Sequence, residues 1–458
     1  MKRNKEVDLT EGPLFRKIIL FALPLIATNV LQLLFNAVDV ATLGMFVSDE
    51  AVAGVGSTGA LVNLIVSLFV GVSTGANVLV ARYVGSRDAE HAHRAVGTAV
   101  VVSVGFGVLL AVIGWFCSYT FLEWMECDPE VIDLAAKYMR IYFLGMPIIM
   151  LYNFAASILR AVGDTVRPLI YLVIGGVANV LLDIFSIVVL GFDVEGVAIA
   201  TVGAQLISAI LAIIAMTRET GYARLEKQYL RIDGPELLIM MKIGVPAGLQ
   251  GCVFSISNVL IQSTINSFGK LMVAGSTIGS QIDGFIYTTM YAVALAALSV
   301  VSQNLGAGKI DRVRSAVRWS MVITVGVGLL VGGAALLLCE PLAGMMSRDA
   351  TVIGYACLRI EILASTYFLC GIMDVFGNSM RGLGESTLAM LISLFGNCVI
   401  RVIWVKTVVT IPAYHTPEML YIIYPISWAL TALVYIPFYF RKIGKLKKKA
   451  ALDAALTA

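Results

Sequence analysis

A stripe of polar residues runs along the first long apolar segment of the chain. Its members are Thr28, Gln32, Asn36 and Asp39. Spacings of four, four and three residues place all of them on one face of a helix. A carboxylate at the centre of an apolar span costs roughly 2.5–3.5 kcal/mol, so Asp39 requires a polar partner or water. The stripe is either a structural hydrogen-bond seam between helices or part of a binding site.

A second polar cluster lies further along the chain. Asn179 and Asp183 are one helical turn apart within an apolar run, and Thr201 follows in the next run. With a rise of about 1.5 Å per residue, Asp39, Asp183 and Thr201 all lie roughly 10 Å below the outer surface. Their oxygens suit a hard cation such as Na⁺. The two carboxylates could instead share a proton, because like charges resist double ionisation. A neutralised structural pair is the alternative.

Other acids and aromatic residues could line a cavity for varied apolar cations, although ordinary packing would also explain most of the aromatic residues. With Gln32 and Asn36, the candidates for a substrate cavity are Tyr152, Asp283, Tyr287, Tyr291 and Asp374. Arg401 is expected to form a buried structural pair with Glu361 or Asp283. The role of Asp374 stays open.

The elements that must position these residues are membrane-spanning helices. Of the 458 residues, 59% are hydrophobic and only 14% are charged, which excludes an ordinary soluble protein and a disordered chain. Seven cysteines without a CxxC pair and only three histidines make a disulfide framework and a zinc site poor explanations. Twelve apolar runs have a length that fits a bilayer, and Pro24 predicts a kink in the first. They cover residues 14–46, 52–80, 95–120, 131–156, 166–190, 195–217, 236–266, 271–302, 317–340, 351–377, 386–411 and 418–440.

Basic residues indicate how these spans are oriented. The termini and alternate loops together hold 26 of the 33 lysine and arginine residues. Positive loops face the cytoplasm, so both termini are predicted to be cytoplasmic and the number of spans to be even. The basic C-terminal tail is explained by the membrane surface, and no nucleic acid partner is needed.

The chain also repeats itself. The segment Arg160–Thr165 (RAVGDT) recurs 221 residues later as Arg381–Ser386 (RGLGES), and Pro24 pairs with Pro246 at a shift of 222. The predicted fold is therefore an all-α polytopic membrane protein with two parallel six-helix repeats. The expected divisions are an N-terminal bundle at 1–217, a cytoplasmic linker at 218–235, a C-terminal bundle at 236–442 and a basic tail at 443–458.

The second half lacks the acids of the first. Under the repeat shift Asp39 corresponds to Ile261, and the Asn179/Asp183 pair resembles Asn397 and Arg401 after a three-residue gap. A base thus stands where the first half has an acid. A cation site is therefore expected in the first half alone.

Three motifs in this arrangement resemble those of the MATE (multidrug and toxic compound extrusion) transporters. They are Asp39–Gly44 (DVATLG), Arg160–Thr165 (RAVGDT) and Gln303–Gly308 (QNLGAG). The resemblance implies a V-shaped pair of six-helix lobes that exports organic cations or other xenobiotics in exchange for H⁺ or Na⁺. The DinF-like pattern implies an ion-coupling site at Asp39, Asn179, Asp183 and Thr201. The NorM-like branch adds an acid on the seventh helix, where this chain reads Cys252–Ser257 (CVFSIS) without one.

The expected protein is a secondary antiporter of the bacterial inner membrane that acts as a monomer, without a cofactor. No Walker A sequence is present, so ATP is not the direct energy source. A lipid-linked precursor flippase of the same superfamily is the first alternative. A membrane-embedded enzyme would need a His/Asp, Ser/Lys or metal constellation within the bilayer, and the sequence shows none. A passive channel fits poorly with a polar cluster confined to one half.

Overall fold

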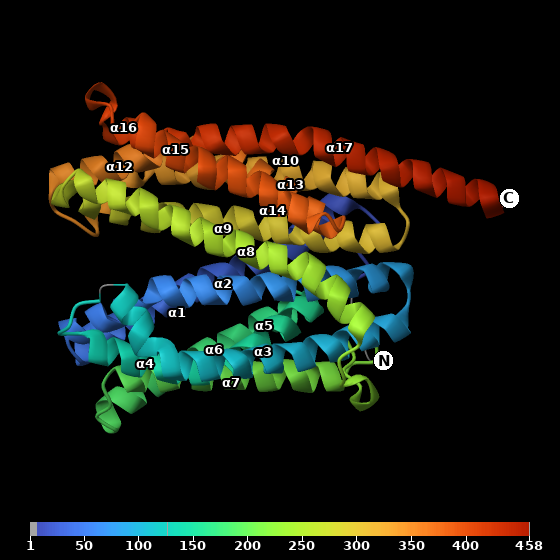
Figure 1. The fold of residues 1–458 in the computed structure, drawn as a ribbon, viewed down its shortest axis with the longest axis horizontal. Helices are drawn as coiled ribbons and strands as arrows, with labels where there is room; N and C mark the ends of the chain where they lie inside the picture. Colours follow the sequence, from blue (N-terminus) through green and yellow to red (C-terminus); the bar gives the residue numbers. More distant parts are fainter. Residues whose placement is uncertain (1–6, 126, 458) are drawn as a thin grey trace. The chain divides into compact units, whose positions relative to one another are not determined.

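The computed structural model describes residues 7–125 and 127–457, and every regular element within them is helical (Figure 1). This confirms the predicted all-α class. Ten helices of the described residues are long and apolar enough to cross a membrane. Two further pairs, α4 with α5 and α12 with α13, bend by 51° and 50° and bring the number to twelve if each pair is one span.

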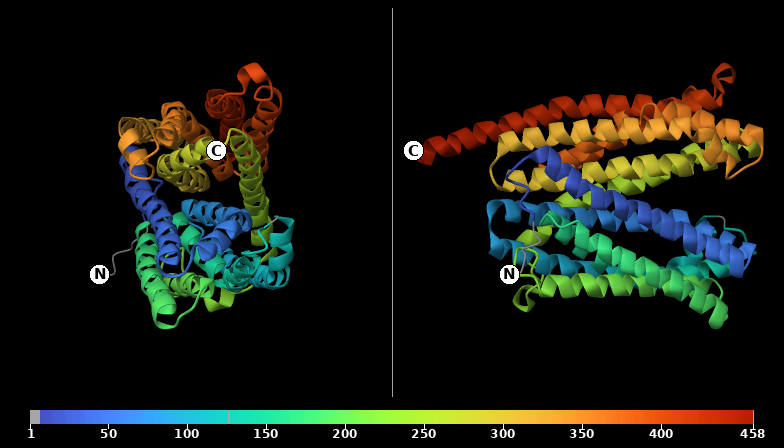
Figure 2. Two further views of the ribbon diagram at one scale, coloured as in Figure 1. Left: turned by 90° about the vertical axis from the view of Figure 1, so that its left-hand side faces the viewer. Right: turned by 180° about the vertical axis from the view of Figure 1, so that it is seen from behind.

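Contacts divide the chain into two compact units. Among the described residues, unit 1 comprises 7–8 and 27–248, and unit 2 comprises 9–26 and 249–457. Within each unit the long helices run side by side (Figures 1 and 2). Helices α1 (Leu14–Phe46) and α8 (Gly234–Ser267) contribute to both units. In each of these two helices the division falls two residues after the repeated proline, Pro24 or Pro246.

The remaining elements each belong to one unit. Those of unit 1 are α2 (Asp49–Ser86), α3 (Ala89–Trp124), α4 (Ile132–Leu144), α5 (Met146–Ala161), α6 (Val166–Ile184), η1 (Phe185–Val189), α7 (Val194–Thr217) and the short η2 (Lys227–Tyr229). Those of unit 2 are α9 (Lys270–Gly306), α10 (Ile310–Leu337), α11 (Cys339–Gly344), α12 (Ala350–Ala364), α13 (Tyr367–Gly382), α14 (Ser386–Ser393), η3 (Leu394–Val399), α15 (Ile400–Thr407), η4 (Pro412–Tyr414), α16 (Pro417–Tyr421) and α17 (Ile423–Thr457). The predicted basic tail is thus a continuation of α17, as far as Thr457. The predicted division of the chain at the linker 218–235 stays a prediction.

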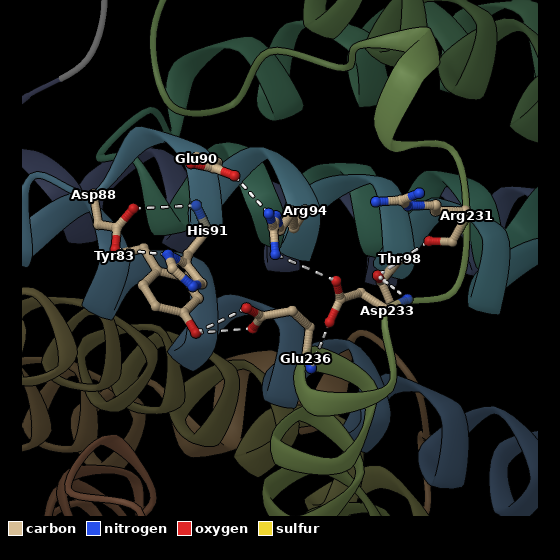
Figure 3. Close-up of polar contacts among 9 residues, drawn as sticks. All are labelled: Tyr83, Asp88, Glu90, His91, Arg94, Thr98, Arg231, Asp233 and Glu236. Carbon is tan, nitrogen blue, oxygen red and sulfur yellow. Dashed lines mark hydrogen bonds and ion pairs between the residues drawn. The ribbon is translucent and has the colours of Figure 1, made fainter.

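The segment between α7 and α8 is fixed to the ends of α2 and α3 (Figure 3). The Tyr83 hydroxyl donates to both carboxylate oxygens of Glu236, at 3.0 and 2.9 Å. The Thr98 hydroxyl accepts a hydrogen bond from the backbone N–H of Asp233 at 3.1 Å, and Arg94 lies 3.9 Å from the Asp233 carboxylate. The polar segment that follows the last span of the first half is therefore packed on unit 1.

A buried ion pair holds the other end of this segment. Arg167, near the start of α6, contacts Asp164 and donates from Nη1 to Glu219 Oε2 at 2.6 Å. Partial burial alone would raise the pKa of the Glu219 carboxyl, but hydrogen bonds from Arg167 and from the backbone hold that pKa below its usual value. Glu219 is therefore charged at neutral pH, and the pair ties α6 to the chain just after α7.

Small residues allow the helices of unit 1 to approach closely, as is usual where the surrounding solvent is lipid. On α3, Gly107 is buried, and a Cβ at this position would collide with the backbone of Pro147 at the start of α5. Gly105 lies on the same helix but is exposed, and a Cβ there would meet no atom within 4 Å.

We expect Gly107→Val to destabilise the protein by about 2–3 kcal/mol, because the added side chain forces α3 away from α5. Gly105→Val is the matched control, since it makes the same change in helix propensity without the collision; it should cost less than about 1 kcal/mol. Thermal unfolding in detergent measures both variants. Equal losses for the two variants would show that the α3–α5 contact does not limit stability.

Candidate functional site

The four residues expected to bind the coupling ion come together within unit 1. Asn179 and Asp183 lie on the last turns of α6, and Asn179 Nδ2 donates to Asp183 Oδ2 at 3.3 Å. The Asp39 carboxyl, on α1, is within interaction range of Asp183, Asn179 and Thr201. The Thr201 hydroxyl, on α7, donates to the backbone carbonyl of Val197 at 2.9 Å, which leaves its oxygen able to accept. Three helices thus contribute two carboxylates, a carboxamide and a hydroxyl to one place.

A close contact between α1 and α6 brings the two carboxylates together. The Phe35 ring packs where a Cβ of Gly176 would stand, so only glycine permits this approach. Asp39 follows Phe35 by one helical turn on α1, and Asp183 follows Gly176 by two helical turns on α6. Both carboxylates therefore lie on the sides of their helices that face this contact. The contact between Phe35 and Gly176 therefore fixes how α1 and α6 are aligned.

The carboxylate pair is poorly supplied with hydrogen-bond donors. Asp183 is fully buried and Asn179 is 5% exposed. Among the described residues, neither Asp39 Oδ1 nor Asp183 Oδ1 has a hydrogen-bond partner, although both atoms are buried. Two adjacent carboxylates in a low dielectric are stable only if a proton or a cation lies between them. The site is chemically suited to bind either H⁺ or Na⁺.

The backbone at this site departs from a regular α-helix. Directly after Asp183, helix α6 continues as the π-helix η1, in which each turn holds an extra residue. The Ser186 hydroxyl donates to the Asp183 carbonyl at 3.1 Å and supports the wider turn. Such π-turns are frequent at functional sites.

Tyr138 is a further neighbour that sequence reasoning missed. It lies on α4, is close enough to Asp39 and Asp183 to interact electrostatically with both, and stacks on Tyr142 at 6.0 Å between ring centroids. The one signal in the sequence is the spacing of these two tyrosines by a single helical turn. Nothing in the sequence indicates that α4 packs beside the acids.

The substrate-cavity candidates of unit 1 differ in their exposure. Gln32 and Asn36 are exposed on α1. Tyr152 is 4% exposed, and its hydroxyl donates to the backbone carbonyl of Pro168 at 3.1 Å. Tyr152 is therefore held within the packing of α5 against the start of α6.

In unit 2 the prediction that Arg401 pairs with Glu361 or Asp283 was wrong. Asp283 pairs instead with Arg359, whose Nε donates to Asp283 Oδ2 at 2.8 Å while Nη1 donates to Ser276 Oγ at 3.0 Å. Glu361 is exposed. Gly279 explains the pairing, because a Cβ there would stand only 2.9 Å from Arg359 Cδ; its absence lets the arginine stem cross α9 toward Asp283.

The other candidates of unit 2 form a group of their own. Tyr287 and Tyr291 stack one turn apart on α9, with ring centroids 5.7 Å apart. Asp374, on α13, is partly exposed and interacts electrostatically with Tyr287. An acid beside aromatic rings is a suitable environment for an organic cation.

Comparison with known proteins decides the family. The MatE family model matches residues 24–185 and 246–405, one stretch in each half of the chain. The chain belongs to the MatE family. Members of this family are membrane transporters and not enzymes.

Relatives of this MatE transporter cover almost its whole length. The probable multidrug resistance protein YoeA of Bacillus subtilis is 25% identical over 93% of both chains. The probable multidrug resistance protein NorM of Thermotoga maritima is 24% identical over 84% of this chain and 83% of its own. An outward-facing multidrug resistance MATE transporter of known structure has the same fold, with a TM-score of 0.89 over 98% of this chain and 100% of its own at 23% identity.

Proposed function

We propose that this MatE protein is a secondary active antiporter that exports organic cations or other drugs in exchange for H⁺ or Na⁺. The observation that carries the proposal is the pair of carboxylates Asp39 and Asp183, each with a buried oxygen that lacks a donor among the described residues. Asn179 and Thr201 complete the proposed ion site. The names of relatives as multidrug resistance proteins support drug export and do not favour a lipid-precursor flippase.

The proposed mechanism uses the repulsion between the two carboxylates. An H⁺ or Na⁺ bound between Asp39 and Asp183 removes this repulsion and draws α1 toward α6. The ion and the drug can then drive alternating access if each favours a different state of the helices. Gln32, Asn36, Tyr287, Tyr291 and Asp374 are the proposed substrate-contacting residues, since they are exposed or partly exposed polar and aromatic side chains.

Transport by the purified protein in liposomes tests this proposal. A pH gradient and a sodium gradient should each be imposed alone, with a fluorescent organic cation as cargo. Export driven by one of the two gradients supports antiport and identifies the coupling ion. Equal cargo movement with and without any gradient would exclude coupled transport.

We propose a location in the bacterial inner membrane, with both termini in the cytoplasm and the protein acting as a monomer. Alkaline phosphatase fused to the C-terminus should be inactive, because this enzyme requires the periplasm to fold. Green fluorescent protein at the same position should be fluorescent. The physical reason is the positive charge of the loops on the predicted cytoplasmic side. An active phosphatase fusion would refute the predicted cytoplasmic C-terminus and the orientation of the two repeats.

A further inference from the structure

Unit 2 holds a buried arginine, Arg401, that has no acidic partner in the part of the chain that the structure describes. Arg401 is only 7% exposed, and no carboxylate among the described residues lies within 4.0 Å of its guanidinium nitrogens. We infer that unit 2 carries an oxyanion-binding site at Arg401, for the carboxylate or phosphate group of a ligand. This inference goes beyond the proposed cation coupling and does not depend on it.

The contacts of Arg401 orient its guanidinium but do not neutralise it. Nε donates to the Ser427 hydroxyl at 2.9 Å, and Nη2 donates to Asn397 Oδ1 at 3.4 Å. The guanidinium carbon lies 4.3 Å from the centroid of the Tyr424 ring and 6.0 Å from that of Trp428. Hydroxyl, amide and ring faces offset part of the lost hydration, but none of them carries a full negative charge.

Arg359 provides a comparison within the same unit. It is 9% exposed and lies 5.5 Å from the Tyr421 ring centroid, so its burial and aromatic neighbour resemble those of Arg401. Arg359 nevertheless has a carboxylate, Asp283, at 2.8 Å. The fold therefore supplies a counter-charge to Arg359. A third buried arginine, Arg381, also has no carboxylate within 4.0 Å among the described residues, but its guanidinium donates to two side-chain amide oxygens, those of Asn378 at 3.0 Å and Gln250 at 2.7 Å. Arg401 has one amide contact of 3.4 Å, and we assign its counter-charge to a ligand. An arginine held in this way can bind an oxyanion through two parallel N–H donors.

The position of Arg401 in the repeat also indicates a ligand site. In unit 1, Asn179 hydrogen-bonds to Asp183 one turn later, next to the π-helix η1. In unit 2, Asn397 lies within the π-helix η3 and hydrogen-bonds to Arg401 one turn later. The two pairs differ in their place, since Asn179 and Asp183 precede η1 whereas Asn397 lies within η3 and Arg401 follows it. Each nevertheless joins an asparagine to an ionisable residue one turn later beside a π-helix, with an acid in one unit and a base in the other. A site that suits a cation in unit 1 has an anion-binding counterpart in unit 2.

The amide of Asn397 is held in the orientation that this site requires. Its Nδ2 donates to Met373 Sδ at 2.9 Å, which turns Oδ1 toward Arg401. The guanidinium plane is therefore set by Asn397 on one side and Ser427 on the other. These contacts prepare Arg401 to receive a planar or tetrahedral oxyanion without a large side-chain movement.

Binding of phenylphosphonate to the purified protein in nanodiscs tests the inference by isothermal titration calorimetry. The wild-type protein should bind it saturably, and Arg401→Gln should weaken binding at least about thirtyfold because the charge is lost. Retained thermal stability shows that the variant is folded, and benzyltrimethylammonium, a cation of similar size, should not compete with phenylphosphonate for either protein. Absence of saturable phenylphosphonate binding to the wild type, or equal affinity in the variant, would overturn the inference.

If Arg401→Gln does not fold, Arg401→Lys is the second variant that tests the inference. It retains the charge but loses the two-pronged geometry, so phenylphosphonate should bind it about fivefold more weakly or worse. Unchanged affinity would place the anion elsewhere. Nanodiscs with and without phosphatidylglycerol distinguish the source of the natural oxyanion. Competition by this lipid identifies a headgroup as the occupant, and unchanged affinity identifies a soluble ligand.

Discussion

Asp39→Asn and Asp183→Asn should each abolish ion-driven export while the protein still folds and reaches the membrane. Each change removes one of two carboxylates that share one ion, and asparagine preserves the volume of the side chain. Loss of one buried charge partner costs about 3 kcal/mol or more, so ion affinity should fall at least about a hundredfold. The measurement is cargo export from liposomes under the gradient that drives the wild type.

The double variant should be no worse than either single variant. Because both carboxylates act on the same ion, their effects cannot add. Asp133→Asn is the matched control, since Asp133 is an exposed acid on α4 and should leave transport unchanged. Wild-type export by both single variants would mean that the pair is only structural.

The sequence predicted the class of the fold because hydropathy, loop charge and the repeat all depend on local composition. It also predicted that Asp39, Asn179, Asp183 and Thr201 meet, and the structure places their side chains within interaction range. The prediction was possible because a carboxylate in an apolar span must have a polar partner. Asn179, Asp183 and Thr201 formed the one other polar cluster at the estimated depth of Asp39. Whether these residues couple transport stays a proposal.

The partner of Asp283 could not be predicted in the same way. Arg359 and Arg401 both lie in apolar spans of the second half, and a depth estimate does not say which of them crosses to α9. The choice depends on Gly279, whose missing side chain lets the Arg359 stem pass. Close helix packing of this kind is a tertiary property that hydropathy does not contain.

The π-helices η1 and η3 also escaped prediction. An extra residue in a helical turn changes no residue type and leaves no periodic signal over five or six positions. Tyr138 was missed for another reason. Its helix carries no acid at the depth of the site, so the sequence does not indicate that this helix packs there.

The two halves should differ in their response to loss of an acid. Unit 1 brings the carboxyl groups of Asp39 and Asp183 together, whereas in unit 2 Asp283 is already neutralised by Arg359. Asp374 is the acid of unit 2 that lies beside the proposed substrate-contacting tyrosines. Asp374→Asn should therefore change the affinity for an organic cation and leave ion binding unaltered. Asp283→Asn is unsuitable for this comparison, because it would leave Arg359 buried without a counter-charge and destabilise the fold.

Binding of the coupling ion to the purified protein is the most direct test. Radioactive sodium binding and proton uptake at low salt should be measured for the wild type, Asp39→Asn and Asp374→Asn, with retained thermal stability as the criterion for folding. We predict that Asp374→Asn binds the ion as the wild type does and that Asp39→Asn loses it. A single site in unit 1 explains this result, because without a carboxylate pair unit 2 cannot compensate the dehydration of an ion. Ion binding that is lost in Asp374→Asn and kept in Asp39→Asn would contradict the account and place the site in unit 2.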